Sequence, residues 1–286
     1  MLLADGWGVA PFCYNSVVSL PFSKSQIQRL GERLIASNEP AEPDLDALNE
    51  LLLAYDDMLG RALDVVRELG FEPTSRVKNT GTILEKLERQ GGSWLKSIQD
   101  LAGMRVVLDG DRGTQDAAVA AIVRAFTDPG REPRVTDRRV QPSHGYRAVH
   151  VIAQLEGMPV EIQVRTRYQH EWADMFEKLA DVIGRGIRYG EPPSRLAGEL
   201  DPPSDLPPER VQALRHIREL AHKWHVALVG SAVALSDLID GLERAEAGGA
   251  SQNDPKLQEM WAEVQDGLVA FRERIKEIAP LEPDVL

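Results

Sequence analysis

The 286-residue chain contains one cysteine, Cys13. A single cysteine excludes an intramolecular disulfide framework and any metal site built from several cysteines, and it fits a reducing compartment. No run approaches 18 apolar residues, so no membrane span is expected. No basic residue precedes Lys24, so the start lacks the charged n-region of a signal peptide. These absences favour a cytoplasmic globular protein with no membrane partner.

Positive charge is also scarce. The net charge is −12 at pH 7, which speaks against a general nucleic-acid binder. The charge is unevenly spread, because residues 1–75 sum to −7 and residues 191–286 to −8, which leaves +3 for residues 76–190. Exposed helices rich in Glu and Asp would explain the acidic flanks. A centre that handles phosphate would explain the contrast between the centre and the flanks.

Hydrophobic spacing predicts helices at both ends of the chain and a sheet in the middle. Apolar residues recur at helical spacing from Ser25 to about Ser37 and from Asp44 to Gly70. Between about 71 and 166 short apolar runs alternate with helical patterns, which is typical of an α/β (α+β) fold with helices layered on a mixed sheet. Extended runs are expected at Phe71–Lys78, Met104–Leu108 and Val135–Val140, and helices at Gly81–Gln90, Thr114–Phe126, 167–183, 209–247 and 255–278.

The chain is therefore expected to have four parts. These are an N-terminal helical extension (1–70), a core (71–190), a proline-rich linker (191–208) and a C-terminal helical region (209–286).

The segment from His144 to Thr166 reads as two extended runs folded about Glu156-Gly157. In the second run Val160, Ile162 and Val164 alternate with Glu161, Gln163 and Arg165, so a period of two puts the polar groups on one face. Tyr146 and His150 share one parity on the first run and are expected to join that face. Such a face is either solvated, as in many antiparallel sheets, or a ligand site.

Two earlier stretches suit a polyphosphate. Arg76 and Lys78 flank Val77 on an extended run, and "NTGT" then leads into a helix that carries Lys86. The cations would attract phosphate, and free backbone N–H groups at the helix start would receive its oxygens. A Walker A loop is absent from the sequence. Asp100 lies just before a strand that carries Arg105, and with Glu161 it forms a carboxylate pair able to hold Mg²⁺ while substrate phosphates complete the shell.

Four ordered motifs carry a resemblance: "RVKNTGTILEKL", "QDLAGMRVV", "HGYRAVH" and "VEIQVRTRYQHEWA". In order and approximate distance they resemble the synthetase domain of the RelA/SpoT family of alarmone synthetases, over about residues 71–185. The His-Asp hydrolase module and the C-terminal regulatory domains of long members are not found, so the chain looks like a stand-alone small synthetase. The resemblance implies a nucleotidyltransferase-like mixed sheet and transfer of pyrophosphate from ATP to the 3′-hydroxyl of GDP or GTP, which makes (p)ppGpp and AMP.

The resemblance also implies roles for individual residues. Arg76 and Arg105 would contact the adenine of ATP, and Lys78 and Lys86 its phosphates, with Thr82 where the family usually has serine. Asp100 would bind Mg²⁺, and Glu161 would join it or act as the base. On the acceptor side Tyr146 would stack on the base, and His150, Gln163 and Arg165 would line the site. The family's usual Lys-Pro-Asn-Gly-Tyr reads "QPSHGY" here.

Alternative functions remain open. A toxin-type relative would use the same chemistry on an adenine nucleotide or on the 3′ end of tRNA. Five arginines would then offer a backbone-binding patch, or else they form the synthetase's own phosphate surface: Arg131, Arg134, Arg138, Arg139 and Arg147. A silent binding module on the same fold is a third hypothesis, against which the presence of Asp100 and Glu161 together with Arg76 and Lys78 argues. The acidic C-terminal helices would serve homo-oligomerisation, an antitoxin-like role or an autoinhibitory cover.

Overall fold

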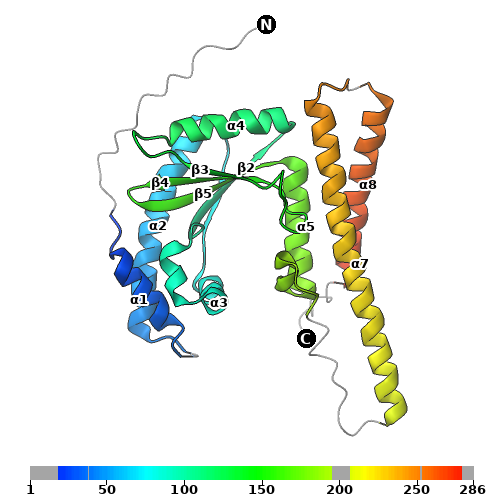
Figure 1. Ribbon diagram of the computed structural model, residues 1–286, viewed down its shortest axis with the longest axis horizontal. Helices are drawn as coiled ribbons and strands as arrows, with labels where there is room; N and C mark the ends of the chain where they lie inside the picture. Colours follow the sequence, from blue (N-terminus) through cyan, green and yellow to red (C-terminus); the bar gives the residue numbers. More distant parts are fainter. Residues whose placement is uncertain (1–18, 38, 195–206, 252, 279–286) are drawn as a thin grey trace, which may run out of the picture. The chain divides into compact units, whose positions relative to one another are not determined.

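The computed structural model describes residues 19–37, 39–194, 207–251 and 253–278 (Figure 1). Cys13 and most of the predicted linker lie outside this part of the chain. The described residues form two compact units that interleave in sequence. The first takes its residues from Met1–Val107, Asp116–Thr136 and His150–Val164, and the second from Leu108–Gln115, Asp137–Val149 and Arg165–Leu286.

Two N-terminal helices belong to the first unit. Helix α1 (Lys24–Leu34) begins one residue before the predicted start, because Ser23 forms a capping box with Gln26. Helix α2 (Glu42–Glu68) ends ahead of Gly70, whose φ of 85° glycine adopts without strain. A short 3₁₀ helix, η1 (Gly92–Ser97), packs against α1 and was not predicted.

The sheet has five strands in the order β1-β2-β5-β4-β3. They are β1 (Thr74–Val77), β2 (Ala102–Leu108), β3 (Arg134–Asp137), β4 (Val149–Leu155) and β5 (Met158–Thr166). Helices α3 (Thr80–Gln90) and α4 (Arg112–Ala125) separate the first three strands along the chain (Figure 1). The expected α/β class, a sheet flanked by helices, is confirmed.

The β4-β5 hairpin turns where the sequence predicts it. Glu156 and Gly157 have φ of 51° and 83°, the pair of positive values that a type I′ turn requires. Along β5 the alternation is confirmed up to Val164, because Val160, Ile162 and Val164 are fully buried while Glu161 and Gln163 are part-exposed. The apolar face of β5 therefore belongs to the core of the first unit. On the other face Glu161 and Gln163 are part-exposed, whereas Arg165, which was expected there too, is only 2% exposed.

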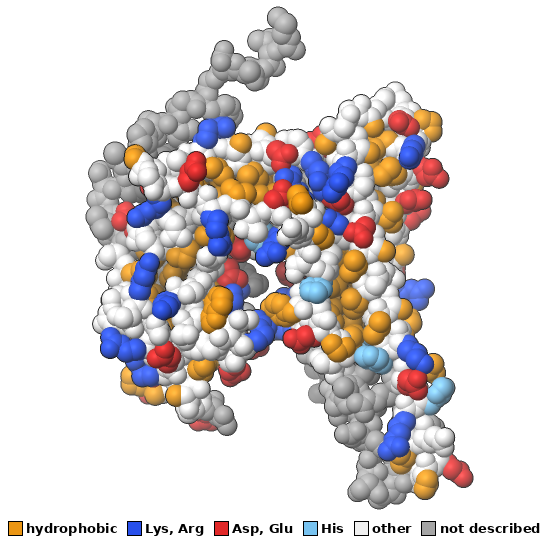
Figure 2. Space-filling model, viewed as in Figure 1, with side chains coloured by type: hydrophobic (Ala, Val, Ile, Leu, Met, Phe, Trp, Pro, Cys, Tyr) orange, Lys and Arg blue, Asp and Glu red, His pale blue; other side chains and the backbone are white. Residues whose placement is uncertain are grey.

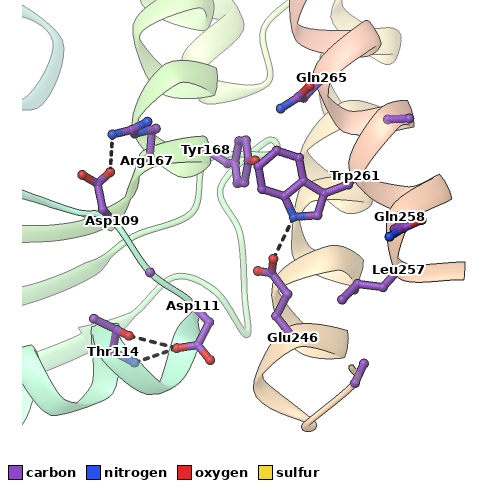
Figure 3. Close-up of a pocket in the computed structure, with 13 residues that line it drawn as sticks. Asp109, Asp111, Thr114, Arg167, Tyr168, Glu246, Leu257, Gln258, Trp261 and Gln265 are labelled. Atoms are coloured by element: carbon purple, nitrogen blue, oxygen red, sulfur yellow. Dashed lines mark hydrogen bonds and ion pairs between the residues drawn. The ribbon is translucent and has the colours of Figure 1, made fainter. Parts of the chain in front are cut away.

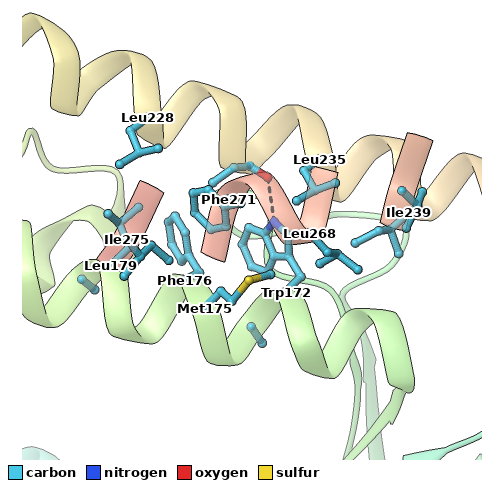
Figure 4. Packing of buried hydrophobic residues seen from close by; sticks show 14 of the residues in the cluster. Trp172, Met175, Phe176, Leu179, Leu228, Leu235, Ile239, Leu268, Phe271 and Ile275 are labelled. Atoms are coloured by element: carbon cyan, nitrogen blue, oxygen red, sulfur yellow. Dashed lines mark hydrogen bonds between the residues drawn. The ribbon is translucent and has the colours of Figure 1, made fainter. Parts of the chain in front are cut away.

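The second unit is built on three long helices, α5 (Arg167–Ile183), α7 (Pro208–Ala247) and α8 (Pro255–Ile278), with a short 3₁₀ helix η2 (Arg185–Tyr189) after α5. Their buried faces form one cluster (Figure 4). At its centre Trp172 stacks on Phe176 with ring centroids 4.7 Å apart, and its Nε1 donates to the Ala232 carbonyl at 2.6 Å. The C-terminal helices thus pack on the helix that follows β5.

Part of α7 is long and apolar, although no membrane span is expected from the sequence. Glu219–Ala247 is long and apolar enough to cross a membrane by length and composition alone. Nearly half of its most apolar stretch is buried, and Asp240 and Glu243 near its end are buried in ion pairs. A core helix of a globular unit has the same length and composition, so we assign α7 to the core of the second unit.

Candidate functional site

The first group of predicted residues meets around Asp100 in the first unit. Lys78 follows β1, Lys86 lies one and a half turns into α3, and Asp100 precedes β2. The Asp100 carboxylate accepts from Lys86 Nζ at 2.9 Å on Oδ1 and from Lys78 Nζ at 3.0 Å on Oδ2. Burial by itself raises the pKa of Asp100, but the charges and hydrogen bonds of the two lysines bring it below its ordinary value. Asp100 is therefore ionised at neutral pH.

Helix α3 starts differently from the expectation. Asn79 is its N-cap, and its Oδ1 accepts from both the backbone N–H of Thr82 at 2.8 Å and the Thr82 hydroxyl at 2.7 Å. The backbone N–H of Thr82, one of the groups expected to be free for phosphate at the helix start, is thus already bonded to the Asn79 side chain. A phosphate at this helix start would have to displace Asn79 to reach it.

Glu161 is the centre of a second cluster in the same unit. Its Oε1 lies 2.8 Å from His150 Nδ1, and its Oε2 accepts from Gln163 Nε2 at 2.9 Å. Burial raises the pKa of Glu161, and the negative charge of Asp100 raises it further. The hydrogen bond and charge of His150 and the hydrogen bond of Gln163 outweigh both, so the pKa of Glu161 lies below its ordinary value. Three of the five residues predicted on this face are therefore brought together.

The two carboxylates suit a hard cation only in part. Among the described residues there is no group of three or more His, Cys, Asp and Glu that could hold a metal. Mg²⁺ in phosphate-handling sites is typically bound by one or two carboxylates and by the substrate's oxygens. Asp100 and Glu161 fit that donor set. All four of their oxygens already have nitrogen partners, so a cation would exchange with those partners.

Arg76 and Arg105 occupy the antiparallel pair β1 and β2. The register sets Thr74 opposite Arg105 and Arg76 opposite Gly103. Residues directly opposite in a sheet share a face, as do residues two apart on one strand. Positions 76 and 105 therefore lie on the same face of the sheet, as a diagonal pair.

Tyr146 and Arg165 meet in the second unit. Arg165 Nη2 donates to the Tyr146 hydroxyl at 2.9 Å, and its guanidinium carbon lies 5.0 Å from the centre of the tyrosine ring. The expected strand position of Tyr146 is wrong, because β4 begins only at Val149 and Tyr146 closes a turn with Ser143. The "HGY" motif supplies that turn, since His144 and Gly145 both have positive φ.

The five-arginine run does not form a single exposed patch. Arg139 and Arg147 are buried, with 8% and 7% of their surface exposed. Arg139 pairs with Asp137 at 2.7 Å, and Arg147 with Asp237 at 2.5 Å. On the face drawn in Figure 2, Lys and Arg side chains are scattered among acidic and hydrophobic ones. Two of the five residues expected to contact an RNA backbone are therefore engaged inside the protein.

A cavity of about 1120 Å³ in the second unit contains none of the predicted residues (Figure 3). Tyr168 and Trp261 meet edge to face in it, and Trp261 Nε1 donates to Glu246 at 2.9 Å. Its lining includes the carboxylates of Asp109, Asp111 and Glu246, whereas its one arginine, Arg167, pairs with Asp109 at 2.5 Å. This acidic lining is unsuited to a polyphosphate.

Comparison with known proteins gives matches to the same part of the chain. Residues 75–180 match the model of a region found in RelA / SpoT proteins. An uncharacterized protein of Mycobacterium tuberculosis and one of Mycobacterium bovis are each 36% identical over 189 residues, which is 64% of this chain and 67% of theirs.

Solved structures give weaker matches. Small alarmone synthetase 1 from Bacillus subtilis is 21% identical with a TM-score of 0.42, over 72% of this chain and all of that one. Its structure bound to the product pppGpp is 22% identical with a TM-score of 0.40, over 64% of this chain and 94% of that one. Similarity at this level places no ligand in the present chain.

Proposed function

We propose that this chain, which belongs to the RelA/SpoT family, is an ATP-dependent pyrophosphokinase that transfers the β,γ-pyrophosphate of ATP to the 3′-hydroxyl of GDP or GTP. The products would be (p)ppGpp and AMP. One observation supports the proposal most directly. Within the region matched by the family model, two lysines form ion pairs with the Asp100 carboxylate, and a histidine and an amide side chain bond to the Glu161 carboxylate. Fixed cations and ionised carboxylates are what phosphoryl-type transfer demands of a protein.

Lys78 and Lys86 are the donor-side cations in this proposal. Their side chains are 13% and 26% exposed. Their present partner is Asp100, and a polyphosphate with its cation would replace one set of ion pairs by another. Arg76 and Arg105, on one face of β1 and β2, would hold the adenine between guanidinium planes.

The transfer itself needs little covalent chemistry from the protein. The acceptor's 3′-oxygen bonds to the β-phosphorus, the bond from that phosphorus to the α,β-bridging oxygen breaks, and AMP leaves with that oxygen. Glu161, ionised at neutral pH, would accept the hydroxyl proton or help to hold the cation. Mg²⁺, held by Asp100 and Glu161, would neutralise charge on the phosphate oxygens.

The acceptor would be recognised by Tyr146. Its ring contacts the Arg165 guanidinium and packs against the core cluster of the second unit, so its position is fixed, and in this proposal it would stack on the nucleobase. Stacking of a base on an aromatic side chain contributes about 1–3 kcal/mol. His150 and Gln163 would line the acceptor side, and both are held in place through Glu161.

The experiment that tests the proposal follows the label of ATP carrying ³²P at the γ-phosphate. Purified protein and Mg²⁺ would be offered GDP, GTP, ATP and deacylated tRNA as separate acceptors. Glu161→Gln is the disabled variant, and Glu156→Gln at the exposed turn of the same hairpin is its matched control. Label on a guanine nucleotide, lost only with Glu161→Gln, would support the proposal.

Other outcomes would redirect it. Label only on tRNA or on an adenine nucleotide would make the chain a toxin-type enzyme. No transfer to any acceptor would leave the silent binding module. The burial of Arg139 and Arg147 weakens the tRNA alternative, because a guanidinium in an internal ion pair is not available to an RNA backbone.

A further inference from the structure

The turn that precedes β4 is pressed between two helices of the second unit. Ser143 and Tyr146 exchange backbone hydrogen bonds at 3.0 and 3.3 Å, and Gly145 lies between them with φ 87°. A Cβ on Gly145 would lie 2.8 Å from the Trp172 ring of α5 and 3.3 Å from the Val233 Cα of α7. The turn that carries Tyr146 therefore has no room to move against α5 and α7.

Helix α7 also bonds directly to the residues on either side of Tyr146. The Ser236 hydroxyl donates to the Gly145 carbonyl and accepts from Arg147 Nε at 3.1 Å. Arg147 Nη2 donates to Asp237 Oδ1 at 2.5 Å. Ser236 is 3% exposed, so water competes little for these bonds.

A second carboxylate of α7 completes the attachment. Asp240 pairs with Arg112 and lies 3.6 Å from Arg147 Nη1, which donates to the Arg139 carbonyl at 2.7 Å. Its other oxygen, Oδ2, accepts from Arg244 Nε at 3.0 Å, so Asp240, only 8% exposed, is shared by three guanidiniums. Removing its charge would leave these cations with less compensation, which is costly in a buried site.

We propose that α7 is a positioning element for the acceptor, in which Ser236 and Asp240 set the backbone on both sides of Tyr146 and so fix the ring that receives the nucleobase. This inference rests on the proposed function. The tyrosine ring is then held from three directions: by Gly145 before it, by Arg147 after it and by Arg165 at its hydroxyl. The affinity for the acceptor therefore depends on the contacts of α7 with the residues next to Tyr146, whereas the affinity for ATP does not.

The test is a comparison of Ser236→Ala, Asp240→Asn and Ser231→Ala. Ser231 is the matched control, because it lies on the same helix, is exposed, and donates its hydroxyl only to the Ala227 carbonyl of that helix. Steady-state transfer would be measured against GDP and against ATP, and hydrogen exchange would be followed at the backbone amides of Ser143 and Tyr146.

We expect Ser236→Ala to raise KM for the acceptor about tenfold, which corresponds to about 1.4 kcal/mol, with KM for ATP within twofold. Hydrogen exchange at the two turn amides should quicken by a similar factor. If Asp240→Asn folds, its increases in acceptor KM and in exchange rate should be larger. Ser231→Ala should change neither. An active wild type with unchanged acceptor KM and unchanged exchange in Ser236→Ala would overturn the inference. A wild type that transfers no label to any acceptor would instead overturn the proposed function.

Discussion

Replacing Asp100 by asparagine removes the negative charge at the proposed donor site with little change in the size of the side chain. Each ammonium lies about 3 Å from a carboxylate oxygen, so the gross attraction is about 5 kcal/mol per pair at an effective dielectric constant near 20. Desolvation and side-chain ordering cancel most of that attraction. Because the three side chains are only 13–29% exposed, we expect a net loss of about 2 kcal/mol in the unfolding free energy of the first unit.

The assay is urea unfolding followed by circular dichroism. With a slope of about 2 kcal/mol per molar urea, the midpoint should fall by about 1 M. Asp64→Asn is the control, since its single pair with Arg67 is more than half exposed on both sides and should contribute less than about 0.5 kcal/mol.

The same variant has a defined pH dependence. The folded-state pKa of Asp100 is below its ordinary value, so its stabilisation is complete above about pH 4 and is lost as the pH falls through the folded-state pKa. The difference between wild type and Asp100→Asn should therefore shrink below pH 4. A gap that persists undiminished at pH 2.5, or a variant as stable as wild type at pH 7, would refute the electrostatic account.

Asp100→Asn should also change the response to metal. Without Mg²⁺ the two lysines, released from the carboxylate, should bind ATP at least as well as in wild type. Added Mg²⁺ should then increase ATP affinity in wild type and have little effect in the variant. An identical Mg²⁺ response in both proteins, measured by calorimetry, would remove Asp100 from the proposed metal site.

Three further predictions test other parts of the structure. Glu161→Gln should lower the transfer rate at least a hundredfold. Because the pKa of Glu161 is lowered, its titration should cause no change in the wild-type rate between pH 6 and 9. A change of rate with pH in that range that disappears in the variant would contradict this prediction. Gly92→Ala should destabilise the first unit by about 1–3 kcal/mol or more in urea unfolding, because the added Cβ would lie 2.5 Å from the Glu32 Cα. The control Gly60→Ala, which has open space around it, should be neutral or stabilising by up to about 1 kcal/mol. Equal effects of the two substitutions would exclude the close contact at Gly92. Trp172→Ala should cost the second unit about 3–5 kcal/mol by calorimetry, since the ring is 2% exposed, and a loss under about 1 kcal/mol would mean that the cluster repacks.

Periodicity was sufficient to predict most elements of the fold. The alternation of β5 and the start of α5 at Arg167 follow from local patterns, since side-chain parity and the Thr166 capping box are properties of neighbouring residues. Helix η1 was missed because its formation depends on packing against α1, where Gly31 and Gly92 touch. Gly31 and Gly92 are 61 positions apart in the sequence, so no local sequence pattern predicts their contact.

The candidate site shows the same division. The grouping of Glu161, His150 and Gln163 follows from strand parity, and the structure brings the three together. The position of Tyr146 was wrong because parity was extended through a turn whose positive φ values end the strand pattern. Asn79 was overlooked as a cap, although an asparagine directly before a helical pattern is an ordinary N-cap signal.

The uneven charge of the sequence has two physical causes. Within the second unit, Arg112 and Arg147 from the basic centre pair with Asp237, Asp240 and Glu243 of the acidic C-terminal third, so part of the contrast serves to attach α7. Within the first unit, Lys78 and Lys86 pair with Asp100, which lies in the same basic stretch. Apart from Asp237, whose side chain is 63% exposed, the side chains of the first set are at most 15% exposed, and a lost partner would leave a guanidinium with less compensation in a site of low dielectric constant. The side chains of the second set are 13–29% exposed, and under the proposed function a polyphosphate with a divalent cation would replace each partner by another of the same sign. On that proposal, ion pairs that exchange their partners would distinguish the candidate site from ion pairs that only stabilise the fold.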